Sequence, residues 1–225
     1  MERLILSRLQ EKIDDKLIKE QCGFRPGKSC TGQVLNLTEF IEEGFQKGMV
    51  TGVVFVDLSA AYDTVCHRLL ISKLHKMTKD YKLTKFIEQL LANRRFYVEF
   101  SGKPKSRWRK QRNGLPQGSV LSPILFNVYT NDQPLLPNTA NFIYADDRCT
   151  ACQGKDFDEV ERTLNNALAS LSEYYKQNCL RANPSKTQVC AFHLRNREAE
   201  RELSITWEGV QLVHCKYPVY LGVNS

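Results

Sequence analysis

The chain has 225 residues, of which 42% are hydrophobic and 10% aromatic, enough to bury a core in one large domain or two small ones. Its formal net charge of +7 and pI near 9.0 favour a polyanionic partner such as nucleic acid. No apolar stretch approaches the length of a membrane span, and the N-terminus lacks a signal-peptide core. These features exclude a membrane protein and predict an intracellular one, in the nucleus or cytoplasm.

Eight cysteines stand at irregular spacing, which favours buried thiols over a disulfide framework. The pairs Cys149/Cys152 and Cys190/His193 could together suggest four zinc ligands. Both pairs fall in stretches that read as strands, where residues three apart point to opposite faces. We therefore do not expect a zinc site.

The first 50 residues predict two amphipathic helices joined by a loop. Apolar residues recur every three or four positions within residues 1–20 and again over about 31–47. The loop at 21–29 contains two glycines, a proline and basic residues, among them Arg25. It could present N–H groups and positive charge to a phosphate, or it could be a structural turn.

A short β-branched run at 53–56 predicts a buried strand that ends in Asp57. A carboxylate at such a strand end stands where active sites commonly collect, although Asp57 could equally cap the following helix. Asp63 and His67 on that helix are expected to be structural. Helical patterns then continue to about residue 93.

A strand at 96–100 leads into the most basic stretch of the chain. Its basic residues alternate with others, so in an extended chain they would share one face, with Trp108 on the other. This basic ribbon consists of Lys103, Lys105, Arg107 and Arg109. It could bind a phosphate backbone, or it could be a solvated hairpin or a nuclear import signal.

Residues 114–123 predict a shaped loop that opens a helix, with Ser122 as the N-cap and Pro123 at the first helical position. Gln117 lies between a proline and a glycine, where a polar side chain is poorly placed to pack. A ligand explains a polar group on such a rigid loop better than a core does.

Tyr144-Ala145-Asp146-Asp147 follows an apolar run, and its adjacent carboxylates predict the tip of a β-hairpin. Taken alone, the pair indicates a solvated turn. With Asp57 as a third carboxylate it could instead hold divalent cations, which prefer hard oxygen ligands.

The C-terminal third predicts a long helix at 156–178, a strand over 186–192 and a hairpin near 205–212, followed by a strand near 219–223. Lys186, at the start of the first of these strands, is either an ordinary surface lysine or a proton donor to a leaving group.

Taken in order, these motifs resemble the reverse transcriptase domain of non-LTR (LINE-type) retrotransposons, most nearly the jockey-like elements. The resemblance runs over nearly the whole chain, through residues 21–25, 55–63, 114–123, 144–147, 183–187 and 220–222. It implies an α+β fold: the palm of a right-hand polymerase, an antiparallel sheet backed by helices, with partial fingers and no thumb. Residues 1–50 would form the partial fingers and leading helices, and residues 51–225 the palm, within one reverse transcriptase domain.

The resemblance further implies an RNA-directed DNA polymerase that adds dNTPs to the 3′-hydroxyl of a DNA primer on an RNA template. Asp57 and Asp146 would bind two magnesium ions, or manganese, with Asp147 and the Leu58 carbonyl completing the metal site. Lys186 would act as general acid.

Further roles carried over by resemblance concern substrate binding. Tyr62 would lie under the incoming sugar and exclude a 2′-hydroxyl, and Gln117 and Arg25 would lie near the nucleotide. The basic ribbon would contact nucleic acid. The primer would be gripped by Tyr220, Leu221 and Gly222.

Some features depart from the family pattern. The family's fingers begin upstream of Met1 and a thumb follows the palm, so we expect encoded chemistry with a weakened substrate grip, and no endonuclease. Arg148 is unexpected directly after the acids, where small or apolar residues are commoner.

Two alternatives stay open. The first is a catalytically silent retroelement remnant that binds nucleic acid through the basic ribbon. The second is another two-metal palm enzyme such as a nucleotidyl cyclase, which is disfavoured because the loop at 114–123 and the ribbon would then lack a purpose.

Overall fold

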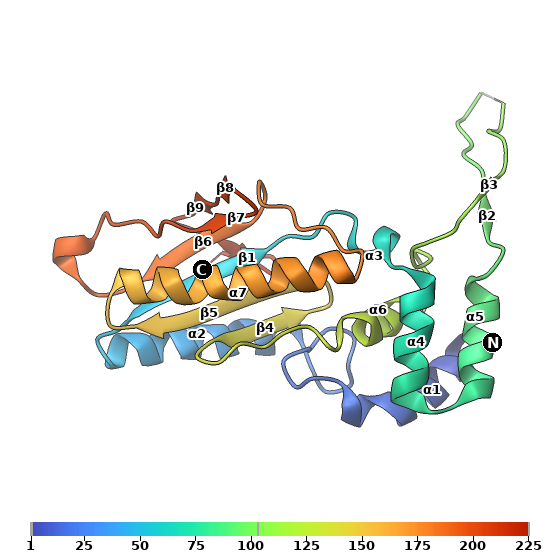
Figure 1. Ribbon diagram of the computed structural model, residues 1–225, viewed down its shortest axis with the longest axis horizontal. Helices are drawn as coiled ribbons and strands as arrows, with labels where there is room; N and C mark the ends of the chain where they lie inside the picture. The colour runs from blue at the N-terminus through green and yellow to red at the C-terminus, as the bar shows by residue number, and fades with distance from the viewer. Residues whose placement is uncertain (1, 103, 225) are drawn as a thin grey trace. The chain divides into compact units, whose positions relative to one another are not determined.

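The computed structural model describes residues 2–102 and 104–224, which form two compact units (Figure 1). The helical unit comprises Met1–Leu17 and Ala60–Asn131, and the sheet unit comprises Ile18–Ser59 and Asp132–Ser225. Each unit is built from two separate segments of the chain. The functional division expected at residue 50 is a different kind of boundary and stays a prediction.

A five-stranded sheet forms the centre of the sheet unit, in the order β4-β5-β1-β6-β9. The pairs β4/β5, β5/β1 and β1/β6 are antiparallel, and only β6/β9 is parallel. The strands are β1 (Val50–Val56), β4 (Ala140–Tyr144), β5 (Asp147–Gly154), β6 (Gln188–Phe192) and β9 (Val213–His214). The antiparallel sheet expected of an α+β palm is confirmed.

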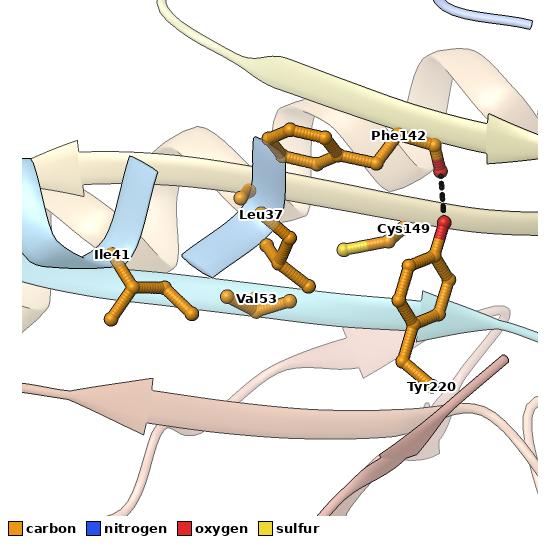
Figure 2. Packing of buried hydrophobic residues seen from close by; sticks show 7 residues of the cluster. Leu37, Ile41, Val53, Phe142, Cys149 and Tyr220 are labelled. Carbon is orange, nitrogen blue, oxygen red and sulfur yellow. Dashed lines mark hydrogen bonds between the residues drawn. The ribbon is translucent and has the colours of Figure 1, made fainter. Parts of the chain in front are cut away.

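Two long helices cover opposite faces of this sheet (Figure 1). Helix α2 (Cys30–Gln46) packs Leu37 and Ile41 against one face of β1 and β5 (Figure 2). Helix α7 (Phe157–Gln177) lies on the other face. It can approach β1 closely because Gly52 has no side chain: a Cβ there would stand 2.3 Å from Val160 Cγ1. The predicted helix at 156–178 is confirmed.

The C-terminal part of the sheet unit forms short hairpins. Its elements are η2 (Asn196–Glu198), β7 (Thr206–Trp207), β8 (Val210–Gln211), β10 (Val219–Tyr220) and β11 (Val223–Asn224). Tyr220 is buried in the core beneath α2, where its hydroxyl donates to the Phe142 carbonyl at 3.1 Å (Figure 2). The hairpin at the chain's end is therefore anchored to the central sheet.

Helices dominate the helical unit. They are α1 (Glu2–Ile13), η1 (Asp14–Lys16), α3 (Ala61–Thr64), α4 (His67–Thr78), α5 (Tyr81–Leu91) and α6 (Ser122–Thr130). Leu70, Leu74, Ile87 and Phe126 are fully buried, which gives this unit its own apolar core. In the part of the chain that the structure describes, no helix is long and apolar enough to cross a bilayer.

Three expected boundaries were wrong. The helix predicted over residues 1–20 ends at Ile13 and continues only as a short 3₁₀ turn. The strand expected at 186–192 begins at Gln188, two residues after Lys186. Leu121, not Ser122, is the N-cap of α6, because the Ser122 hydroxyl instead donates to the Pro116 carbonyl at 2.6 Å.

The strand expected at 96–100 is also shorter than predicted. Only β2 (Arg95–Phe96) and β3 (Arg109–Lys110) pair, at the base of a long hairpin that extends beyond α5 (Figure 1). A two-stranded ribbon with neither face covered is marginally stable, which explains why regular pairing stops after two residues. Of the basic ribbon, Arg109 lies in β3, Lys105 and Arg107 lie outside the paired strands, and Lys103 lies outside the described residues.

Arg148 is buried, with 3% of its surface exposed. Its guanidinium donates to Gln133 Oε1 at 2.7 Å, the Pro134 carbonyl at 2.9 Å and Asn141 Oδ1 at 2.6 Å, and its Nε donates to Thr150 Oγ1 at 3.1 Å. All four acceptors are neutral, and burial lowers the pKa of Arg148. The unexpected arginine therefore fastens the segment before β4 to the hairpin.

Replacing this arginine should destabilise the sheet unit. Arg148→Met leaves buried acceptors without donors, at a cost of about 1–3 kcal/mol for each. Chemical denaturation should therefore show a clearly lower unfolding free energy than for Arg162→Met, which alters an exposed arginine on α7. Equal stability of the two variants would contradict a structural role for Arg148.

Candidate active site

The register of the sheet brings two of the predicted carboxylates together. Val56 on β1 pairs with Arg148 on β5, so Asp57 follows β1 at the level where Asp147 opens β5. Asp146 precedes Asp147 in the turn between β4 and β5. The three acids, separated by up to 90 positions in sequence, thus meet at one end of the sheet, as predicted.

Asp57 is held through its backbone by the segment at 181–187. Its N–H donates to Thr187 Oγ1 at 3.1 Å, and its carbonyl accepts from Asn183 N at 2.9 Å. Thr187 is fully buried and donates in turn to the Asn183 carbonyl at 3.0 Å. The strand end is thereby fixed while the carboxylate itself is left out of these bonds.

The same contacts also bear on Leu58, whose carbonyl the resemblance assigns to the metal site. Leu58 forms a bridge with Ala182, flanked by the bond to Asp57 O and by one from Ser59 N to Arg181 O at 2.9 Å. Neither flanking bond uses the Leu58 carbonyl.

The turn that carries Asp146 has a strained backbone. Tyr144 pairs with Asp147, so Ala145 and Asp146 form a two-residue hairpin turn, and Ala145 has φ 59°. Such turns ordinarily place Gly, Asn or Asp at positive φ, and a residue with a Cβ there costs about 1–2 kcal/mol. Something outside the turn must therefore stabilise this conformation.

Two buried glutamines outside the hairpin hold it, and sequence reasoning missed both. Gln21 bonds to both backbone groups of Ala145, accepting from its N–H at 2.8 Å and donating to its carbonyl at 3.1 Å. Gln33 donates to the carbonyls of Ile143 and Glu20. No spacing in the sequence signals a contact across 124 positions. Gly23 is a signal that could have indicated a close backbone approach, because a Cβ there would stand 2.3 Å from Ala145 N.

Electrostatics at this end of the sheet are unfavourable to the acids. Burial raises the pKa of Asp146, and the nearby charge of Asp57 raises it further. Burial likewise raises the pKa of Asp147, with added repulsion from Asp146 and Asp57. Asp57 is thus near enough to destabilise the charged forms of Asp146 and Asp147, which a bound cation would reverse.

A cavity of about 210 Å³ lies beside these acids. Asp57, Asp147 and Lys186 line it together with Leu221 from the turn after β10. Lys186 is exposed and comes from the segment that holds Asp57. The structure therefore brings the candidate proton donor to the candidate metal ligands.

The donor set suits a hard divalent cation, because carboxylate oxygens that repel one another are the ligands such ions prefer. Within residues 2–102 and 104–224, however, no three His, Cys, Asp or Glu side chains form a ready-made metal cluster. The donor chemistry fits a divalent cation, whereas the three side chains do not form a ligand cluster.

The cysteine pair considered as zinc ligands is divided between the two faces of the sheet. Cys149 lies in the cluster beneath α2, and Cys152 donates to the Val160 carbonyl on α7.

The side chains of two other predicted residues of the sheet unit, Arg25 and Tyr220, make contacts within the fold itself. The Arg25 guanidinium donates to the carbonyls of Ile18 at 2.9 Å and Gln21 at 3.1 Å, which braces the loop. The ring of Tyr220 is part of the core, so contacts from this hairpin to a primer would fall on Leu221, Gly222 and backbone groups.

Tyr62 and Gln117 belong to the helical unit and are described within it. Tyr62 stacks on Phe126, with ring centroids 4.7 Å apart, and its carbonyl accepts from Leu115 N at 2.9 Å. Gln117 is exposed at the tip of the loop that Leu115 enters. The predicted sugar filter and the predicted nucleotide loop are therefore parts of one structure.

Gly114 allows the loop that carries Gln117 to lie close to the backbone of Asp63. It has φ 85°, and a Cβ there would stand 2.8 Å from the Asp63 carbonyl oxygen. His67 Nε2 lies 2.7 Å from the Gly114 carbonyl oxygen, in agreement with the structural role expected for His67.

The long hairpin of the helical unit exposes basic and aromatic side chains together. Its exposed rings are Phe96, Phe100 and Trp108, and its described basic residues include Lys105, Arg107, Arg109, Lys110 and Arg112. Lys105 lies over the ring of Tyr97 and pairs with Glu99 at 3.3 Å. We name this segment, residues 95–112, the aromatic–basic hairpin.

Comparison with curated proteins gives matches over almost the full chain. A "Probable RNA-directed DNA polymerase from transposon BS" of Drosophila melanogaster is 34% identical over 236 residues, covering 99% of this chain and 25% of that protein. An "RNA-directed DNA polymerase from mobile element jockey" of Drosophila funebris is 28% identical over 233 residues, with the same two coverages. The chain thus spans about a quarter of the length of these relatives.

Among solved structures, apo telomerase from Candida tropicalis matches with a TM-score of 0.64 at 13% identity, covering 94% of this chain and 39% of the telomerase chain. This likeness shows the fold and supports the palm architecture. The family described as "Reverse transcriptase (RNA-dependent DNA polymerase)" matches residues 1–224. The chain therefore belongs to the reverse transcriptase family.

Proposed function

We propose that this chain is the polymerase domain of an RNA-directed DNA polymerase, which adds dNTPs to a primer 3′-hydroxyl. The observation that carries the proposal is the meeting of Asp57, Asp146 and Asp147 at one end of the sheet, in a chain of this family. The fixed backbone of Asp57 and the cavity shared with Lys186 support it.

Divalent cations belong to this proposal because family members depend on them generally. Magnesium, or manganese, would be held by Asp57, Asp146 and Asp147, with the Leu58 carbonyl as a further oxygen ligand. When bound, two such ions activate the primer hydroxyl and neutralise the charge on the triphosphate.

The remaining residues act on the substrates. Lys186 would protonate the departing pyrophosphate oxygen, since its exposed ammonium lines the same cavity as Asp57. Tyr62 would exclude a ribose 2′-hydroxyl, and Gln117 and Arg25 would contact the incoming nucleotide.

An RNA template and a DNA primer are the partners that this chemistry requires. Primer contacts would come from Leu221 and Gly222, and template contacts from the basic residues of the aromatic–basic hairpin, with Lys103 as a further candidate. Action on such substrates would take place in the nucleus or cytoplasm. Residues 1–50 would serve as partial fingers and 51–225 as palm.

A second candidate function is nucleic-acid binding without catalysis. The aromatic–basic hairpin favours it, because exposed rings beside cationic side chains bind unpaired bases without any need for the acids.

Removing one acid separates the two functions. Asp146→Asn should reduce magnesium-dependent primer extension on an RNA template by more than the roughly 10–100-fold typical of losing an outer-shell partner. Because the raised pKa of Asp146 reflects a destabilised carboxylate, the metal-free variant should unfold at the same or a higher temperature than the wild type at pH 7. Unchanged extension would refute the catalytic reading.

Sugar selection should depend on the ring of Tyr62. Tyr62→Ala should lower the preference for dNTPs over ribonucleotides by at least about tenfold, or roughly 1.4 kcal/mol, in single-nucleotide incorporation. Tyr62→Phe keeps the ring stacked on Phe126 and should keep the preference. If both variants discriminate like the wild type, Tyr62 is not the filter.

Trp108 provides a signal for binding at the aromatic–basic hairpin. The chain's two tryptophans differ sharply, since Trp108 is 64% exposed and Trp207 only 2%. A single-stranded oligonucleotide should therefore quench the emission of the wild type and not of Trp108→Phe, and the apparent affinity should fall steeply with salt. Equal quenching in the two proteins would place the binding elsewhere.

A further inference from the structure

We infer that Gln21 is a positioning residue: its side-chain amide holds Ala145 in the conformation that presents Asp146 and Asp147 to divalent cations. The inference rests on the proposed function, because it assigns Gln21 a part in the same metal site. Gln21 itself touches no reacting group, and it would act through the backbone of the turn.

The contact pairs a side chain with both backbone groups of one residue. Gln21 Oε1 accepts from Ala145 N at 2.8 Å, and Gln21 Nε2 donates to the Ala145 carbonyl at 3.1 Å. A neighbouring strand would satisfy a backbone N–H and carbonyl in this way. Since Ala145 lies in the turn, beyond the strand ladder, the glutamine takes the place of the missing strand.

The turn needs such a partner for two reasons. Ala145 has φ 59°, a conformation that an alanine adopts only when its surroundings impose it. The next two residues are acids that repel each other and Asp57. Released from Gln21, the turn could relax toward negative φ, and Asp146 would then point in a different direction.

Gln21 is itself rigidly placed against the hairpin. It forms a parallel bridge with Ile143, and the adjacent Cys22 N donates to the Ile143 carbonyl at 2.8 Å. Gln21 Oε1 also accepts from Gly23 N at 2.8 Å. A Cβ at Gly23 would stand 2.3 Å from Ala145 N, so the whole segment fits closely over the turn.

Metal binding tests the inference without nucleic acid or nucleotide. The free Mn²⁺ signal in electron paramagnetic resonance would be titrated with wild-type protein and with Gln21→Met, which removes the two bonds to Ala145 and the one from Gly23 N at similar volume. Affinity should fall about 10–100-fold, as for loss of an outer-shell partner. In primer extension, kcat should fall while the KM for dNTP changes far less, because the substrate contacts are kept.

Gln33→Met is the matched control. Gln33 is similarly buried, at 2% exposure against 1% for Gln21. It donates to the Ile143 and Glu20 carbonyls and accepts from Cys22 Sγ and Asn36 Nδ2, and none of these four bonds involves Ala145. It should lower the unfolding temperature of the protein and leave Mn²⁺ affinity near the wild-type value.

A second change separates positioning from mere packing. Ala145→Gly removes the strain, because glycine adopts positive φ freely. In the Gln21→Met background it should restore much of the lost Mn²⁺ affinity and of kcat. Comparing this double variant with Ala145→Gly alone also gives an answer if Gln21→Met by itself does not fold.

The outcomes are distinguishable. Wild-type Mn²⁺ affinity in folded Gln21→Met, or a double variant that gains nothing from Ala145→Gly, would overturn the positioning role while the proposed function stands. A wild-type chain that neither binds Mn²⁺ nor extends a primer would overturn the proposed function, and the inference with it.

Discussion

Mutual repulsion among Asp57, Asp146 and Asp147 is the constraint on which the rest of the sheet unit depends. Neutral hydrogen bonds to the backbone hold the acids in place against this repulsion. Thr187 and Asn183 bond to the backbone of Asp57, and Gln21 bonds to the backbone of the turn. Because these bonds leave the carboxylate oxygens out, the same contacts that hold the acids in place leave them able to bind a cation.

Arg148 shows how a buried positive charge can stand next to the acids without neutralising them. Although Arg148 is among the residues that line the cavity with Asp147, its guanidinium donates to neutral groups such as Gln133 Oε1. Its partners are all neutral, among them Gln133 and Asn141. The arginine therefore stabilises the scaffold of the hairpin, which accounts for its presence at a position where a small residue is expected.

In the helical unit, one set of contacts unites motifs that the sequence separates. The carbonyl of Tyr62 accepts from Leu115 N, and Gly114 packs against the backbone of Asp63. The loop that presents Gln117 is thus built directly on the short helix that presents Tyr62. A change in the conformation of either motif should alter the conformation of the other, since both belong to a single packed structure.

The sequence alone determined the local elements and the identity of the acids. The period of apolar residues predicted α2 and α7, and the Asp146-Asp147 pair predicted a hairpin tip, because both signals are local. Only the tertiary structure decided the partners: Gln21 meets Ala145 across 124 positions, and Thr187 meets Asp57 across 130. Such pairs leave no periodic trace, because a buried glutamine or threonine is defined by the backbone groups it satisfies and not by its neighbours in the chain.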